Sequence, residues 1–195
     1  MTLKLNGSSS GSVAIDAPAS TTGGADRTVT CPDANGTMAL TSNILFSSYA
    51  IIEDQKAHDT HGGTFTQDAW RTRELNTEVA DPDSIVSISS NQFTLQAGTY
   101  LLKWSAPARD LTHHQTRIYN ITDSAVVRYG SSEYTNSLDV QNHSVGSARV
   151  TISGAKAFEL QHYGHNTTAT TGFGCAAKSD GGTEHYSFVE IYKEL

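Results

Sequence analysis

Two pairs of histidines, each with its members three positions apart, are the first residues in this sequence that suggest chemistry. His58 and His61 stand in "HDTH", and His162 and His165 stand in "HYGH". Imidazole binds zinc and related metals, but residues i and i+3 of a regular strand point to opposite faces. The spacing therefore predicts no metal at "HYGH". A metal at "HDTH", in an expected loop, is the less favoured alternative to a chain without a metal site.

Nucleophilic catalysis is not indicated by any motif. The pattern Gly-x-Ser-x-Gly does not occur, and Cys175 in "GFGCAA" does not open a helix. The glycines at 172 and 174 lack the βαβ unit that would make them a phosphate-binding loop. Asp81 and Asp83 flank a proline, so turn formation explains them without calcium. We predict no catalytic residue and no cofactor.

The charge balance argues against a nucleic-acid partner. The chain has 195 residues, with 13 Lys and Arg against 20 Asp and Glu and a formal net charge of −7, the opposite of what neutralises phosphates. Residues 2–12 lack the basic and apolar regions of a secretory signal, and no membrane-length apolar run follows. We expect synthesis in a cytosol and no membrane insertion. Cys31 and Cys175 are far apart and are expected to be free.

From residue 44 onward, short apolar runs are separated by turn signals, a pattern typical of an all-β sandwich or barrel. Alternation is clearest in "TYLLKWSA", where Tyr100, Leu102 and Trp104 share one face. Gly98, just before them, stands where a turn needs positive φ. We expect ten strands, near residues 45–53, 64–75, 84–89, 92–96, 99–106, 115–121, 125–130, 144–152, 156–163 and 185–193.

Residues 1–43 contain no aromatic side chain and differ from the rest of the chain. Apolar pairs with the period-2 spacing of a strand face are Leu3 and Leu5, Val13 and Ile15, and Val29 and Cys31. So few large apolar groups do not offset roughly 1–2 kcal/mol of backbone entropy per residue. The segment is either disordered or ordered by other chains. We favour the second and predict an anchoring or intertwined β arm, 1–43, before a knob, 44–195.

Two stretches resemble the C1q/TNF-like jelly roll: "NQFTLQAGTYLLKWSA" and the closing "HYSFVEIYKEL". The matching positions are Phe93, Gly98, Tyr100, Tyr186, Phe188 and Ile191. Residues 49–100 also look like bacteriophage and bacterial members of that superfamily, and the opening residues resemble the N-terminal arms of phage fibre proteins. The collagen-like repeat of the animal branch is lacking, so the immune roles of that branch are not implied.

The resemblance implies a ten-strand jelly-roll sandwich that assembles as a homotrimer, with the final strand near the threefold axis. On that strand Tyr186, Phe188 and Tyr192 alternate along one face. We therefore expect these three side chains at the trimer interface, with Val189 and Ile191 on the opposite face.

The resemblance also implies a non-enzymatic structural protein of a bacteriophage virion, made in the cytoplasm of the host bacterium. We expect a fibre or spike knob that contacts the host surface, while the arm contacts other virion proteins. A capsid decoration trimer, anchored to the major capsid protein by the arm, is the alternative that the short chain favours. A glycan hydrolase is a third possibility, since two carboxylates roughly 5 to 9.5 Å apart are all that it requires.

Contacts with a host glycan or protein are expected in the polar loops near 55–63, 107–114, 131–143 and 164–183. Within these loops the side chains suited to stacking on a sugar are aromatic rings and imidazoles. The candidate ligand-binding residues are His113, His114, Tyr134 and His165.

Overall fold

The computed structural model describes residues 3–6, 12–15, 45–136 and 139–195. The chain divides into two units, Met1–Met38 and Ala39–Leu195. In the first unit, β1 (Leu3–Asn6) pairs antiparallel with β2 (Ser12–Ile15), at the first two of the three predicted apolar alternations. The third, Val29 and Cys31, lies outside the described residues, and the role of the arm stays a prediction.

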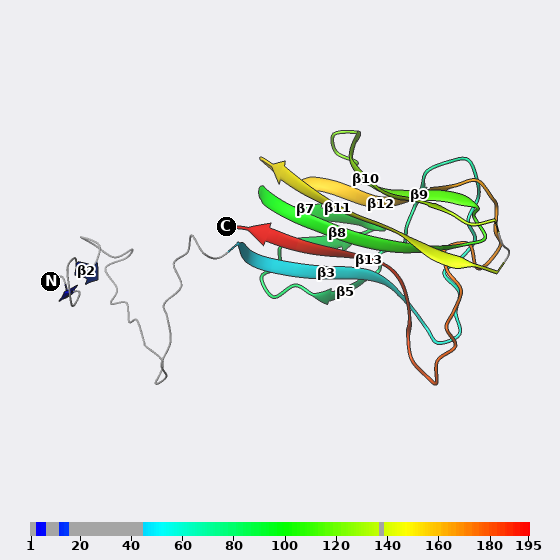
Figure 1. Ribbon diagram of the computed structural model, residues 1–195, viewed down its shortest axis with the longest axis horizontal. Helices are drawn as coiled ribbons and strands as arrows, with labels where there is room; N and C mark the ends of the chain where they lie inside the picture. The colour runs from blue at the N-terminus through cyan, green and yellow to red at the C-terminus, as the bar shows by residue number, and fades with distance from the viewer. Residues whose placement is uncertain (1–2, 7–11, 16–44, 137–138) are drawn as a thin grey trace. The chain divides into compact units, whose positions relative to one another are not determined.

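The second unit is a sandwich of two antiparallel sheets (Figure 1). The first, which we call the β9 sheet, has the order β10-β9-β12-β7-β6, with β4 paired to β12. Its strands are β4 (Arg71–Thr72), β6 (Val86–Ser89), β7 (Gln92–Leu95), β9 (His113–Asn120), β10 (Ala125–Tyr134) and β12 (Lys156–Gly164). Among the described residues there is no helix with the length and apolar character needed to cross a membrane.

The second sheet, which we call the β8 sheet, has the order β11-β8-β13-β3-β5. Its strands are β3 (Phe46–Lys56), β5 (Thr77–Ala80), β8 (Gly98–Arg109), β11 (Gln141–Ile152) and β13 (Glu184–Glu194). The final strand β13 lies between β8 and β3, so it is hydrogen-bonded along both edges (Figure 1). Central placement explains why β13 carries apolar residues on both faces.

The core lies between the two sheets and contains the predicted face of β8. Tyr100 and Leu102 are fully buried, and Trp104 is 2% exposed. From the β9 sheet, the stacked rings of Phe93 and Phe158 meet them, with centroids 5.5 Å apart. Burying each such side chain contributes about 1.5–3 kcal/mol to the stability of the fold. The residues that alternate in the sequence are thus the ones that form the core.

One expected strand, 64–75, is wrong. Phe65 forms only an isolated bridge with Thr168, and Asp68 has a φ of 60°, which breaks the extended conformation. The backbone is held by the segment 168–174 instead, for example through Gly63 N donating to Thr170 O. The short strands β4 and β5 take its place, so the two sheets contain eleven described strands rather than ten.

The predicted turns form for the expected reasons. The Asp81 carboxylate accepts hydrogen bonds from the backbone N–H groups of Ile85 (2.8 Å) and Val86 (2.9 Å). This carboxylate therefore closes a turn, as the neighbouring proline indicated. Gly98 opens β8 with a φ of 155°, a conformation that side chains rarely adopt.

Trp104 on β8 packs against a strand position that must be glycine. A Cβ placed on Gly146 of β11 would lie 2.1 Å from Cζ2 of the indole. The indole is also held from the other sheet, because its Nε1 donates to Oγ1 of Thr116 at 2.9 Å. The ring therefore has no room to move away from an added side chain.

Replacing Gly146 with valine is expected to lower the free energy of unfolding by about 1–3 kcal/mol or more, because the branched side chain overpacks the Trp104 site. Urea unfolding followed by tryptophan fluorescence measures it. Gly154→Val is the matched control, since nothing lies within 4 Å of a Cβ at Gly154. Equal stability of the two variants would contradict this account of the core.

Candidate functional site

Three of the four predicted ligand-binding residues come together on the outer face of the β9 sheet. His113 begins β9 and pairs with Tyr134, which ends β10. Their rings lie 4.4 Å apart between centroids, and the His165 ring stands 5.7 Å from that of His113. Because two of the three lie at strand ends, their positions are set by the sheet rather than by a loop.

Further rings extend this group across the sheet. Tyr163 of β12 lies 5.4 Å from His165, and Trp70, just before β4, lies 5.5 Å from Tyr163. Tyr129 of β10 lies 5.8 Å from Trp70. We call this row the aromatic belt, and its members are Tyr134, His113, His165, Tyr163, Trp70 and Tyr129. The sequence did not single out the last three, because the one signal for them was that polar and aromatic side chains shared the outward face of strands.

Four members of the aromatic belt, namely Trp70, His113, Tyr163 and His165, line a cleft of about 210 Å³. Besides Trp70 and Tyr163 and the imidazoles, its lining includes Gln115, Ser132 and Glu133. The Gln115 amide is fixed, since its Nε2 donates to Gly130 O and to Ser132 Oγ at 3.0 and 3.1 Å. The cleft thus combines ring surfaces with hydrogen-bonding groups of defined orientation.

His114 also borders the cleft, but its ring is turned into the sandwich, and it does not lie in a loop because β9 begins one residue earlier. It is 3% exposed, with Nε2 2.8 Å from Asn142 Oδ1 and Nδ1 2.9 Å from Nε2 of His162. With neutral rings, His114 donates to Asn142 and accepts from His162. The predicted loop position of His114 is therefore wrong. His114 lies in β9, and because successive strand residues face opposite sides, it is buried while His113 is exposed.

Burial also controls the charge of these two rings. It lowers the pKa of His114. It holds the pKa of His162 well below its ordinary value, and the positive charge of Arg73 lowers it further. His162 and His165, three apart in "HYGH", do face opposite sides: His162 is fully buried and His165 is exposed.

The two histidines of "HDTH", His58 and His61, also lie in different surroundings. His61 Nδ1 accepts a hydrogen bond from the backbone N–H of Ala176 at 3.0 Å, whereas His58 is exposed. Among the residues described, no three His, Cys, Asp or Glu side chains are grouped as metal ligands would be. Cys175 is free and half-buried, as predicted, and Cys31 lies outside the described ranges.

The three residues predicted for the trimer interface do not share one surface. A register shift interrupts β13 between His185 and Phe188. Tyr186 is 5% exposed, and its hydroxyl donates to the backbone oxygen of Thr60 at 2.7 Å, so Tyr186 belongs inside the protomer. Phe188 and Tyr192 remain half-buried on the outward side of the β8 sheet.

That outward side, which we call the outer sheet face, carries apolar residues on four neighbouring strands. They are Tyr49, Ile51, Leu101, Val145, Phe188 and Tyr192. Beside Phe188 and Val145 is a hollow of about 390 Å³. Tyr49 and Val145 are 45% and 49% exposed, so part of this apolar surface is open to water.

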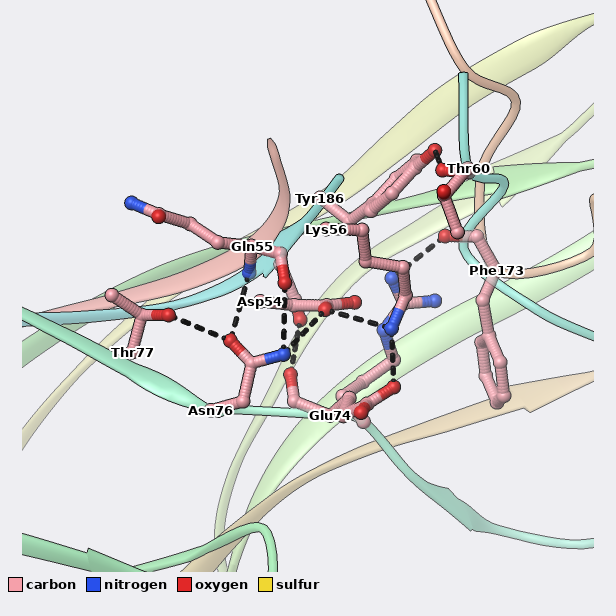
Figure 2. A network of polar contacts seen from close by, with 11 residues as sticks. Asp54, Gln55, Lys56, Thr60, Glu74, Asn76, Thr77, Phe173 and Tyr186 are labelled. Atoms are coloured by element: carbon pink, nitrogen blue, oxygen red, sulfur yellow. Dashed lines mark hydrogen bonds and ion pairs between the residues drawn. The ribbon is translucent and has the colours of Figure 1, made fainter. Parts of the chain in front are cut away.

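A polar network joins the end of β3 to residues 74–76 (Figure 2). Lys56 bonds to Asp54 and Glu74, and Asn76 bonds to Asp54 and to the backbone of Gln55. Burial would lower the pKa of Lys56, but its bonds with Glu74 and Asp54 outweigh that effect and raise it. Burial raises the pKa of Asp54 despite the attraction of Lys56. The network holds residues 74–76 against the end of β3.

Neither the protein-family models nor the curated proteins give a match to the sequence. Solved structures are similar in fold. Murine APRIL at pH 5.0 aligns with a TM-score of 0.50 and 11% identity over 75% of this chain and 98% of that chain. Eiger TNF from S. frugiperda aligns with a TM-score of 0.48 and 14% identity over 78% of this chain and 94% of that chain. The globular domain of zebrafish complement 1qA protein aligns with a TM-score of 0.45 and 13% identity over 76% of this chain and 97% of that chain.

The chain therefore has the all-β, C1q/TNF-like jelly-roll fold, and the fold class that the sequence implied is confirmed. At these identities the likeness concerns the fold alone.

Acidification is expected to destabilise the folded chain through His114 and His162. Their folded pKa values lie below the unfolded value of about 6.5, so the unfolded state gains protons first as the pH falls. Stability is fully present above pH ~6.5 and falls below it by about 1.4 kcal/mol per pH unit for each ring that stays neutral. Urea unfolding between about pH 7 and pH 5 measures this slope.

The variant His162→Gln is expected to reduce that slope, because one of the two neutral rings is removed. His58→Gln, on an exposed ring, is the matched control and should leave the slope unchanged. Identical slopes for His162→Gln and the wild type would mean that burial of His162 does not govern its protonation.

Proposed function

We propose that this chain is a non-enzymatic structural protein of a bacteriophage virion, a homotrimeric knob that contacts the host surface. The outer sheet face is the observation that carries the proposal. It carries apolar side chains on four neighbouring strands of the β8 sheet, in two groups around Tyr192 and Phe188 with Glu190 and Lys103 between them, and a single copy leaves them partly open to water. Association of copies through this face removes that apolar surface from water.

Two ion pairs lie on the outer sheet face. Arg149 pairs with Glu194 at 2.7 Å, and Lys103 pairs with Glu190 at 3.4 Å between Tyr192 and Phe188. Protein interfaces commonly combine apolar contacts with polar groups. Closed rings use two different patches on each copy, so the hollow beside Phe188 is suited to receive side chains from the next copy.

The assignment to a virion rests on the sequence resemblance of residues 49–100 and of the N-terminal arm to phage proteins. In this proposal the arm contacts other virion proteins and the aromatic belt contacts the host. A capsid decoration trimer, with the arm on the major capsid protein, is the second candidate, and the place of the chain in the particle distinguishes the two.

The aromatic belt supports binding rather than hydrolysis. Among the described residues that line its cleft, Glu133 is the one carboxylate. Hydrolysis of a glycosidic bond ordinarily uses a pair of carboxyl groups facing each other across the substrate. The cleft therefore supplies contacts for a ligand without the pair of groups that would cleave it.

The purified chain is expected to have a mass of about three times 20.9 kDa by light scattering at micromolar concentration. Phe188→Glu should shift it toward the monomer, because a carboxylate buried at a subunit contact weakens association by about 2 kcal/mol or more. Tyr134→Glu is the matched control, an equal change on the opposite sheet, and should keep the trimer mass. A monomeric wild type would count against the proposal.

Labelled antibody against the chain is expected to decorate the tail tips of purified virions in electron micrographs. Label on the head would favour the decoration trimer instead, since the two candidates differ in location and not in fold. Absence of label from every particle, with the chain present in the infected cell, would contradict both.

A further inference from the structure

The aromatic belt exposes more ring surface than the packing of the sandwich requires. Tyr134 is 58% exposed and Tyr129 is 48% exposed, both on β10 at the edge of the β9 sheet. Covering exposed apolar surface of this kind with a partner is favourable, by roughly 25 cal/mol per Å². Tyr134 packs on His113 and Tyr129 on Trp70, which both line the cleft, and exposed rings beside a cleft mark a place where a ligand binds.

The rings are held in position before any ligand arrives. Arg117 of β9 lies 4.0 Å above the Trp70 ring and 4.7 Å from that of Tyr119, and its Nε donates to Gln161 Oε1 at 2.8 Å. The Tyr163 hydroxyl and His165 Nδ1 are each 3.5 Å from the Asp68 carboxylate. Fixed rings bind a ligand with little loss of side-chain entropy.

The angles between the rings select the shape of the ligand. The planes of His113 and Tyr134 are tilted by 37°, those of Trp70 and Tyr163 by 53°, and those of Tyr163 and His165 by 80°. A flat base is best held against a parallel ring face, and these pairs offer no parallel slot. Rings at such angles suit a puckered ligand that presents C–H groups in several directions.

The charges around the cleft select against an anion. Glu133 lines it, and Asp68 lies behind His165. The guanidinium of Arg117 is engaged by Trp70, Tyr119 and Gln161, so it is not directed at the cleft. Ser132, Gln115 and Glu133 instead offer acceptors and donors to hydroxyl groups.

We infer that the cleft bordered by Trp70, His113, Tyr163 and His165 binds one ring of a neutral saccharide. A sugar ring has apolar C–H faces for the aromatic belt and hydroxyls for Gln115, Ser132 and Glu133. The volume of about 210 Å³ is smaller than the ~300–1,000 Å³ typical of drug-sized ligands, which fits a single ring with its chain continuing outward. This inference names the ligand of the proposed host contact and rests on that proposal.

The test is a fluorescence titration of the full chain with the methyl glycosides of glucose, galactose and N-acetylglucosamine. Of the two tryptophans, Trp104 is 2% exposed and hydrogen-bonded, so a saturable change reports on Trp70. Glucuronate and adenosine serve as the anionic and the flat comparison. We expect saturation with at least one neutral glycoside and none with glucuronate or adenosine. Saturation by glucuronate or adenosine alone would overturn the inference.

Variants locate the binding in the cleft. His113→Ala and Tyr134→Ala should each weaken binding about tenfold, because His113 lines the cleft and the Tyr134 ring, 4.4 Å from it, holds it in place. Tyr134→Phe retains the ring and His58→Ala removes an exposed imidazole elsewhere, so both should bind as the wild type does. Equal affinity of Tyr134→Ala and Tyr134→Phe would overturn the role of the aromatic belt.

Adsorption of the labelled chain to a panel of bacterial strains separates this inference from the proposed function. Adsorption that survives Tyr134→Ala, with no neutral glycoside bound, would overturn the inference and leave the host contact standing. Saturable glycoside binding that is lost in Tyr134→Ala, with no adsorption to any strain and no label on virions, would support the inference and reject the proposed function.

Discussion

The burial of Trp104 between the two sheets is the constraint on which the rest of the sandwich depends. Its Nε1 donates to Thr116 of β9, and Oγ1 of Thr116 lies 2.8 Å from Oγ of Ser144 on β11. Ser144 in turn donates to the backbone oxygen of Ser131 on β10 at 2.7 Å. One buried ring thus ties strands of both sheets together, because each polar group near it must find a partner away from water.

These successive hydrogen bonds fix the strands that carry the aromatic belt. Thr116 and Ser131 lie two to three residues from His113, His114 and Tyr134 along β9 and β10. Since side chains alternate across a strand, His113 faces the cleft while His114 faces inward to His162. The outward rings therefore take their positions from groups packed behind them.

The two surfaces that carry the functional proposals lie on opposite sides of the jelly roll. The outer sheet face belongs to the β8 sheet, and the aromatic belt belongs to the β9 sheet (Figure 1). Copies associating through the first leave the cleft at the second free for a ligand. A sandwich separates these roles because each sheet has one face in the core and one facing out.

The sequence by itself determined the all-β class, most of the strands and the core face of Tyr100, Leu102 and Trp104, because period-2 alternation and turn chemistry are local. It also indicated His113, Tyr134 and His165 as candidate ligand-binding residues. Only the tertiary structure decided that 64–75 is not one strand, that Tyr186 is buried, and that Trp70 and Tyr163 complete the aromatic belt. Those outcomes depend on which distant segment covers a strand face or pairs with its edge, and alternation does not encode that.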